Sequence, residues 1–328
     1  MPRPLLASSR PSTPTTSPTK PKLPITPGFR LAPMSPSTTY SKSSATTAGR
    51  GYLNGSPLKS KSLASGVDGK AAGGMETLSL IEASKRLAAY TAVDQHVKPE
   101  HRIIGIGSGS TVPYVVDRIV QQGVELNAGR VFIPTGFQSR QLIVAAGLTL
   151  GDVDQYPTID ITIDGADEVD HNLNCVKGGG ACHLREKVLA EAAHTFILVA
   201  DYRKNVQFLG TNYLSGVPIE VVPFAYNKVL HNLHHSLGSP KAALRMAIKK
   251  AGPVVSDNGN FIIDAPFTQE QLADPYTVLA QIKMLTGVVE VGLFCKMAKA
   301  AYFGNEDGSV TVRWDDGRVE VVPSATSA

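Results

Sequence analysis

The sequence has 328 residues and a formal net charge of +4, from 32 lysines and arginines against 28 aspartates and glutamates. Residues 1–67 hold nine of the basic residues, none of the acidic ones and 11 of the 22 prolines, so the rest of the chain carries a net charge of −5. The part that can bury a core is therefore mildly acidic, which argues against a basic nucleic-acid-binding domain.

Residues 1–74 are expected to form a disordered basic tail rich in Ser, Thr and Pro, because they contain too little apolar surface to offset chain entropy. Their composition also resembles an organelle transit peptide, but the prolines prevent a long amphipathic helix. A cytoplasmic protein is the prediction, and an organellar one is the alternative. No apolar run approaches the roughly 18 residues of a membrane helix, so no membrane partner is expected. The three cysteines do not suggest a set of disulfide bonds, so the protein is expected in a reducing compartment.

From residue 75 to 210, apolar stripes of helical spacing alternate with short β-branched runs. The predicted strands cover 102–106, 131–133, 159–163 and 196–200, and the predicted helices lie around 78–93, 114–122, 142–146 and 184–193. This alternation indicates a Rossmann-like parallel α/β domain.

The pattern changes between residues 211 and 295, where a smaller domain is expected. It predicts a strand over 218–222, a helix through Leu230 and Leu237, a hairpin of 253–255 with 261–263, a helix over 277–285 and a strand over 288–294. This order favours an α+β domain with a ferredoxin-like antiparallel sheet. Strand-like pieces in 301–322 are expected to return to the first domain, which would then comprise 75–210 plus 296–328.

The loop from Gly105 to Thr111 follows the first strand and precedes a helix. Its glycines allow close backbone approach, and hydroxyls and helix-start amides bind anions, which suits a phosphate. The dinucleotide fingerprint fails because its third glycine position is Ser110, and no Walker lysine follows. A structural glycine-rich turn remains the alternative.

An acidic segment from Asp164 to Asp170 follows the third strand. Ligands bind beyond the carboxyl ends of strands in open α/β sheets, so Asp164 is predicted to be functional. A solvated structural role is expected for Glu168 and Asp170.

The segment from Lys177 to Lys187 begins with a lysine and three glycines. Consecutive glycines are costly to order and suggest backbone contact with a ligand, beside which Lys177 would supply a cation. Two interpretations remain for Glu186, which could be a functional residue or an exposed residue at an ordinary helical position. Lys204 could likewise bind a phosphate or be a surface lysine. Cys182 and His183 lack further ligands at metal-site spacing, so no metal is expected.

These segments, in this order, resemble the type A ribose-5-phosphate isomerase family, especially its eukaryotic, fungal branch. The matching stretches lie between about residues 78 and 312 and read GIGSGST, PTGFQS, DGADEVD, KGGGACHLREK, VADYRK, DNGNFI and GVVEVGLF. The sequence departs from the common family pattern at Gly136 and at Cys182-His183, neither of which is a catalytic position that the resemblance implies.

The resemblance implies an aldose–ketose isomerase of the non-oxidative pentose phosphate pathway. It would interconvert D-ribose 5-phosphate and D-ribulose 5-phosphate through an enediolate, without metal or nucleotide cofactor, and as a homodimer. Glu186 would be the general base, and Lys177 with neighbouring amides would stabilise the oxyanion. Asp164 and Asp167 would bind sugar hydroxyls and assist ring opening. The implied substrate-binding residues are Ser108, Gly109, Ser110, Thr111, Gly165, Ala166, Gly178, Gly179, Gly180 and Lys204, with Lys85 from a less exact match.

Two other functions compete with this one. A non-catalytic sugar-phosphate-sensing module on the same scaffold would need the anion loop, but neither a base nor an oxyanion partner. A dinucleotide-dependent dehydrogenase would need the glycine fingerprint that this sequence breaks.

Overall fold

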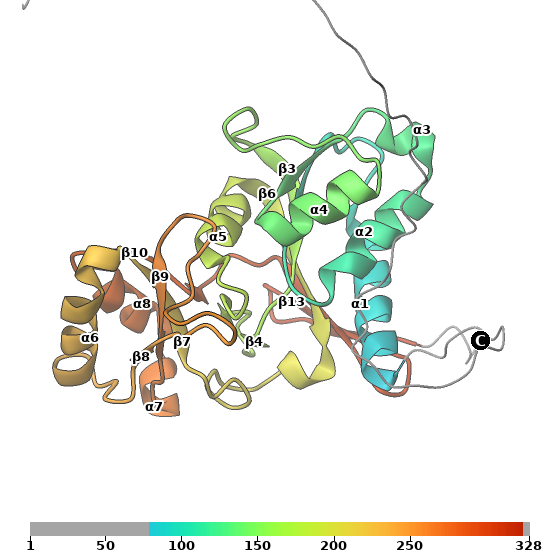
Figure 1. Cartoon of the computed structure of the whole chain (residues 1–328). Helices are drawn as coiled ribbons and strands as arrows, with labels where there is room; N and C mark the ends of the chain where they lie inside the picture. The colour runs from blue at the N-terminus through green and yellow to red at the C-terminus, as the bar shows by residue number, and fades with distance from the viewer. Residues whose placement is uncertain (1–78, 324–328) are drawn as a thin grey trace, which may run out of the picture. The chain divides into compact units, whose positions relative to one another are not determined.

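A seven-stranded sheet with the order β14-β13-β12-β6-β3-β1-β2 organises the larger part of the fold (Figure 1). The structure is a computed structural model that describes residues 79–323, so the predicted tail over 1–74 lies outside the described residues. The strands of this sheet are β1 (Ile103–Ile106), β2 (Val131–Pro134), β3 (Ile159–Asp164), β6 (Ala193–Asp201), β12 (Ala300–Gly304), β13 (Val310–Trp314) and β14 (Val319–Val322).

Five of these strands, β2, β1, β3, β6 and β12, are neighbours and run parallel, while β13 and β14 extend one edge antiparallel. Numbered along the chain, the parallel strands lie in the order 2-1-3-4-5. The strand order therefore reverses between β1 and β3, which is where ligands bind in doubly wound folds. The predicted parallel α/β sheet is confirmed, and the C-terminal strands β12, β13 and β14 are part of the same sheet.

Both faces of the central parallel strands are buried, as the apolar strand β6 illustrates. Ile197 and Val199 pack in a core with α1 and α2, whereas Phe196 and Leu198 pack on the opposite face, beside residues of α5 and β5. Strands that are covered on both sides need continuous apolar runs, which explains why residues 196–200 lack polar alternation.

The helices of the described chain agree with the predicted positions to within a few residues, and short helical turns join them. Within residues 79–323, no helix is both long and apolar enough to cross a membrane. The helices are α1 (Leu80–His96), α2 (Val112–Gln121), α3 (Val124–Asn127), α4 (Phe137–Ala145), α5 (His183–Ala192), α6 (Tyr226–His235), α7 (Gln269–Leu272) and α8 (Pro275–Lys283), with 3₁₀ turns η1 (Tyr202–Lys204) and η2 (Pro223–Ala225).

A separate four-stranded antiparallel sheet has the order β10-β7-β9-β8 and its own apolar core. Its presence confirms the predicted second, antiparallel sheet. Its strands are β7 (Val217–Val221), β8 (Ala243–Leu244), β9 (Phe261–Ala265) and β10 (Val288–Val291).

The predicted hairpin between 253–255 and 261–263 is wrong in its first arm. The turn forms, because Ser256 N donates to Asn260 O at 2.8 Å, but Val255 makes only one isolated bridge, to Phe261. β7 occupies one edge of β9, and β8 pairs with Ile263 and Asp264 on the other, so residues 253 and 254 pair instead with the chain after β8: Val254 N donates to Arg245 O at 2.9 Å, and Pro253 bridges Met246.

The single strand predicted over 288–294 is also wrong, because the chain changes sheets at Gly292. β10 pairs with β7, whereas β11 (Leu293–Phe294) joins a small sheet with β5 (Cys175–Val176) and β4 (Glu168–Val169). A Cβ atom at Gly292 would lie 2.1 Å from the carbonyl oxygen of Lys177, so only glycine allows this crossing.

Candidate active site

The site lies at the reversal of strand order between β1 and β3. The loop after β1 packs directly on the last residue of β3: Gly107 N donates to Ile163 O at 3.0 Å, and a Cβ at Gly107 would lie 2.0 Å from Asp164 Oδ1. Glycine at this position therefore lets the loop lie against Asp164. The loop then enters α2, and the loop residues Ser110 and Thr111, just before that helix, line the same cavity, where the positive end of the helix dipole favours an anion.

Asp164 is fully buried and connects the loop to the rest of the site. Its Oδ1 accepts hydrogen bonds from Ser108 N at 2.9 Å and Gly165 N at 2.7 Å, and its Oδ2 lies 2.9 Å from Lys177 Nζ. These partners hold the carboxylate in one orientation although burial raises its pKa.

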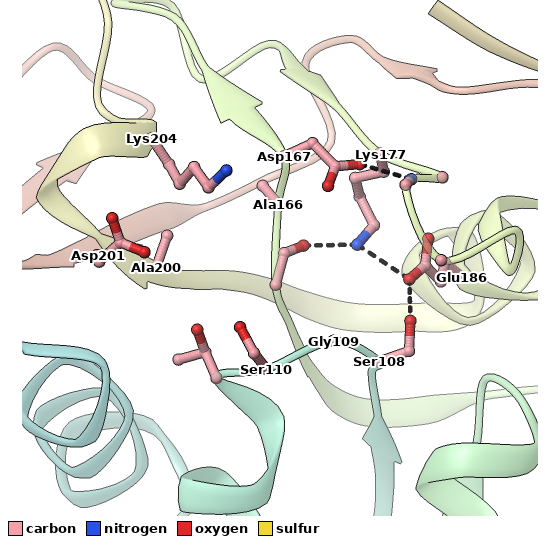
Figure 2. Close-up of a pocket in the computed structure, with 15 residues that line it drawn as sticks. Ser108, Gly109, Ser110, Ala166, Asp167, Lys177, Glu186, Ala200, Asp201 and Lys204 are labelled. Carbon is pink, nitrogen blue, oxygen red and sulfur yellow. Dashed lines mark hydrogen bonds and ion pairs between the residues drawn. The ribbon is translucent and has the colours of Figure 1, made fainter. Parts of the chain in front are cut away.

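Lys177 follows β5 and places its ammonium between two carboxylates. Besides Asp164, it lies 3.4 Å from Glu186 Oε1, and it donates to Gly165 O at 2.5 Å (Figure 2). Burial alone would lower the pKa of Lys177, but Asp164 and Glu186 together raise it above the usual range. The lysine is therefore charged at neutral pH and held in place by these contacts.

Glu186 lies in the first turn of α5 and is only 4 % exposed. Ser108 donates its hydroxyl hydrogen to Glu186 Oε1 at 2.5 Å, while within the described chain Oε2 is buried without a hydrogen-bond partner. Burial, with a smaller contribution from Asp164, raises the pKa of Glu186 to about 7. The alternative that Glu186 is an exposed surface residue is therefore wrong. With this pKa, its carboxylate is suited to exchange a proton near neutral pH.

Asp167 connects the acidic segment to the glycines after Lys177. Its Oδ2 accepts from Gly179 N at 2.7 Å, and burial raises its pKa. Gly178 adopts a positive φ of 107°, and a Cβ there would lie 2.6 Å from His183 Nδ1, so glycine is required at this position.

These side chains surround a cavity of about 150 Å³, which is small beside the roughly 300–1,000 Å³ of drug-sized sites and suits one small metabolite. Lys204 points into it across from Glu186 (Figure 2). The cavity is lined by Ser108, Gly109, Ser110, Thr111, Gly165, Ala166, Asp167, Lys177, Gly178, Gly179, Gly180, Glu186, Ala200, Asp201 and Lys204.

The structure thus brings together all the predicted site residues except Lys85, with Asp164 directly behind the lining. Lys85 lies on α1, is mostly buried and pairs with Glu82 at 2.7 Å. It is not among the residues that line the cavity.

Two acidic residues of the segment after β3 were expected to be solvated, and this expectation is wrong. The buried Glu168 accepts hydrogen bonds from four consecutive backbone amides, Gly210 to Tyr213. The buried Asp170 accepts from Asn172 N and Asn174 N. Both fix loops around the site, and no local pattern indicated the distant partners of Glu168.

Residues missed from the sequence also contribute. Asp201 lines the cavity and forms an ion pair with Arg203 at 2.7 Å. Gln138 holds the anion loop, because its Oε1 accepts from Gly109 N at 2.8 Å and its Nε2 donates to Gly109 O at 3.3 Å. The PTGFQS match contained Gln138, but nothing local revealed its contact.

Comparisons with known proteins agree on one family. The sequence model described as ribose 5-phosphate isomerase A (phosphoriboisomerase A) matches residues 131–308. A ribose-5-phosphate isomerase of Cryptococcus neoformans var. neoformans serotype D is 69% identical over 252 residues, which cover 75% of this chain and 83% of that protein.

Solved structures give the same result. A D-ribose-5-phosphate isomerase in complex with phospho-erythronic acid is 35% identical, with a TM-score of 0.65, and the match covers 71% of this chain and 99% of that one. The ribose 5-phosphate isomerase A of Methanocaldococcus jannaschii is 34% identical, with a TM-score of 0.63 and the same coverage.

Proposed function

Because the chain belongs to the ribose 5-phosphate isomerase A family, we propose that it interconverts D-ribose 5-phosphate and D-ribulose 5-phosphate. The reaction moves one hydrogen from C2 to C1 and one from the C2 hydroxyl to the C1 oxygen. It needs a base, a partner for the oxyanion, a way to move the hydroxyl proton and a site for the phosphate. The residues around the cavity supply candidates for each.

Glu186 is the proposed base. Its Oε2 has no hydrogen-bond partner in the described chain, so it is the oxygen available to take the proton from C2 of the open-chain aldose. A base whose pKa is near 7 can accept this proton and return it to C1 at neutral pH.

Lys177 is the proposed oxyanion partner. As the proton leaves C2, negative charge develops on the carbonyl oxygen at C1, and a fixed ammonium in a dry site stabilises that charge strongly. Lys177 is 2 % exposed and held by Asp164, so it needs no reorientation during the reaction.

Asp164 and Asp167 are proposed to bind sugar hydroxyls and to assist ring opening and the proton shift between O2 and O1. Asp167 is the better placed of the two for direct contact, because it lines the cavity, whereas Asp164 lies behind it and orients Lys177. A carboxyl group whose pKa is raised by burial can both donate and accept a proton.

The loop from Ser108 to Thr111 is proposed to bind the phosphate with its hydroxyls and backbone amides, and Lys204 to add a positive charge. Lys85 is proposed only as a more distant contribution, because it is paired with Glu82.

One observation carries the proposal: a buried carboxylate with its pKa raised to about 7 lies 3.4 Å from a buried lysine, at the wall of a small anion-binding cavity. The test is turnover of ribose 5-phosphate by the full chain with EDTA present. Glu186→Gln should lower kcat by about 10²- to 10⁴-fold, the usual contribution of a general base, and still bind phospho-erythronic acid.

Glu191→Gln is the matched control, since Glu191 lies on the same helix but is exposed. Near-normal turnover by Glu186→Gln would exclude Glu186 as the base. A wild-type chain that binds phospho-erythronic acid and produces no ribulose 5-phosphate would favour the sensing module.

We further propose that the protein acts in the cytoplasm as a homodimer, with no cofactor, nucleic-acid or membrane partner, and that residues 1–74 lie outside the catalytic unit of 75–210, 211–295 and 296–328. Mass spectrometry of the mature N-terminus would detect transit-peptide cleavage. Light scattering would give the oligomeric state, and the EDTA arm tests independence of metal.

A further inference from the structure

The turn at residues 256–260 is held rigidly from inside the small sheet. Glu220 on β7 is fully buried, and its Oε1 accepts hydrogen bonds from Ser256 Oγ at 2.8 Å, Asn258 Nδ2 at 2.9 Å and Asn260 Nδ2 at 2.9 Å. A buried carboxylate with three side-chain donors fixes the turn far more firmly than a surface turn needs.

The same turn makes two contacts outside the small sheet. Asp257 Oδ2 accepts from Phe137 N at 2.8 Å, the first amide of α4, whose own N-terminal residue is Gly136 and has no side chain to cap the helix. Arg185 on α5 donates from Nε to Asn258 Oδ1 at 2.8 Å and from Nη2 to Asp257 O at 3.2 Å.

The residues that the turn contacts, Phe137 and Arg185, are each followed in the sequence by a residue that acts at the site. Gln138, next to Phe137, holds Gly109 of the anion loop through two hydrogen bonds. Glu186, next to Arg185, is the proposed base, and it faces Ser108 of the same loop (Figure 2). One rigid turn therefore contacts the first turns of two helices: α4, whose Gln138 holds the anion loop, and α5, which carries the proposed base.

We propose that Asp257 and Asn258 are positioning residues, which fix the anion loop and the base relative to each other through α4 and α5. This inference rests on the proposed isomerase activity. The two contacts lead to different parts of the site, so their loss should have different kinetic effects. Loss of the Asp257 contact frees the α4 end and Gly109 and should weaken phosphate binding, whereas loss of the Arg185 contact frees the base.

The test compares steady-state kinetics of the full-length wild type with Asp257→Ala, Asp257→Asn and Arg185→Ala, together with titration of phospho-erythronic acid. Asp257→Ala should raise KM and weaken phospho-erythronic acid binding about three- to tenfold, below the roughly 100-fold that a 1 Å misplacement can cost. Asp257→Asn keeps an acceptor oxygen for Phe137 N and should restore both values. Arg185→Ala should lower kcat about tenfold with little change in binding.

Asp274→Ala is the matched control. Asp274 also accepts a hydrogen bond at a helix start, from Thr277 N at 3.2 Å on α8, but its hydrogen bonds stay within that turn. It should lower stability and leave KM and kcat unchanged. Equal losses of kcat in Asp257→Ala and Arg185→Ala at unchanged KM, without rescue by Asp257→Asn, would mean fewer folded molecules and overturn the proposal. An inactive wild type would instead overturn the proposed function.

Discussion

Ser108 donates its hydroxyl hydrogen to Oε1 of Glu186 at 2.5 Å, and this hydrogen bond favours the ionised carboxylate. Two segments 78 residues apart in the sequence, the anion loop and the base helix, thus meet in one hydrogen bond. The loop that is proposed to bind the phosphate therefore also adjusts the acidity of the proposed base.

Replacing Ser108 by Ala should shift the pH dependence of turnover. The wild type should gain activity as the pH rises through about 7, where Glu186 ionises. Without the hydroxyl, the pKa of Glu186 rises further, so the rising limb of kcat against pH should move up by roughly one unit. Ser110→Ala, in the same loop but without contact to Glu186, should change KM and leave the limb in place. An unmoved limb in Ser108→Ala would contradict the assignment.

Replacing Glu186 by Gln should stabilise the protein at neutral and alkaline pH. The carboxyl loses its proton near pH 4.5 in the unfolded chain and near pH 7 in the folded one, so the folded state binds more protons between these values. The free energy of unfolding contributed by Glu186 is therefore present below pH 4.5 and lost as the pH rises through 7. The side-chain amide of the Glu186→Gln variant does not ionise, so the variant does not lose this free energy as the pH rises.

Chemical denaturation at pH 5 and pH 8 would check this prediction. The free energy of unfolding of the Gln variant, taken relative to that of the wild type, should increase from pH 5 to pH 8. In a thermal melt, each 1 kcal/mol of this increase would raise Tm by roughly 2–4 °C. Glu191→Gln should follow the wild type at both pH values. If the free energies of unfolding of Glu186→Gln and the wild type differed by the same amount at both pH values, Glu186 would have an ordinary pKa.

Replacing Lys177 by Met should lower both stability and activity. Removal of the ammonium leaves the carboxylates of Asp164 and Glu186 buried without their cation, which should cost about 3–5 kcal/mol of unfolding free energy. The kcat should fall about 10²- to 10³-fold with the loss of oxyanion stabilisation. Acid pH should recover part of the stability, because the carboxyls become neutral, but none of the activity.

Lys187→Met separates the two effects. Lys187 is also largely buried, and it donates to Glu290 Oε1 at 2.8 Å, Val291 O at 2.6 Å and Leu293 O at 2.9 Å, away from the cavity. This variant should be destabilised and yet keep the kcat of its folded fraction. A comparable loss of kcat in both variants would show that destabilisation alone explains the effect.

Cys182 should react slowly with thiol reagents although it is only partly buried. Burial, with smaller contributions from Glu186 and Asp257, raises the pKa of its thiol to about 12. At pH 8 the thiolate fraction is then roughly a thousandfold below that of an ordinary thiol. Alkylation of native protein at pH 8, followed by mass spectrometry, should find Cys182 unmodified until the chain is denatured. Rapid native labelling would contradict this environment.

The sequence was sufficient for the parts of the fold that depend on local pattern. Short β-branched runs of three to five residues between helical stripes predicted four of the parallel strands, and the end of β3 predicted Asp164. The burial of Glu186 was not predictable, because one turn of α5 has the same local pattern whether it faces solvent or a cavity. Its burial depends on the docking of α5 against β3, β6 and β10, and the pattern within residues 183–192 does not show which face of the helix these strands cover.

The errors have the same origin. The strand at Gly292 changes sheets because of a close approach to Lys177, more than 100 residues earlier in the chain. The turn at Asp257 was recognised, but its partners Phe137 and Arg185 belong to elements predicted separately. Gly136 and Cys182, the two departures from the family pattern, turn out to be neighbours, since a Cβ at Gly136 would lie 3.0 Å from Cys182 Sγ.

Gly292 also constrains how the molecule can move. Its N–H donates to Pro218 O in the small sheet at 2.7 Å, and its carbonyl accepts from Lys177 N at 2.9 Å. A hinge motion that separates the four-stranded sheet from the seven-stranded sheet would have to break one of these two hydrogen bonds. Otherwise it would have to move the backbone of Lys177 away from Asp164. We therefore expect substrate to enter and leave through the rim formed by the exposed Gly109, Ser110 and Gly180, with both sheets held in place.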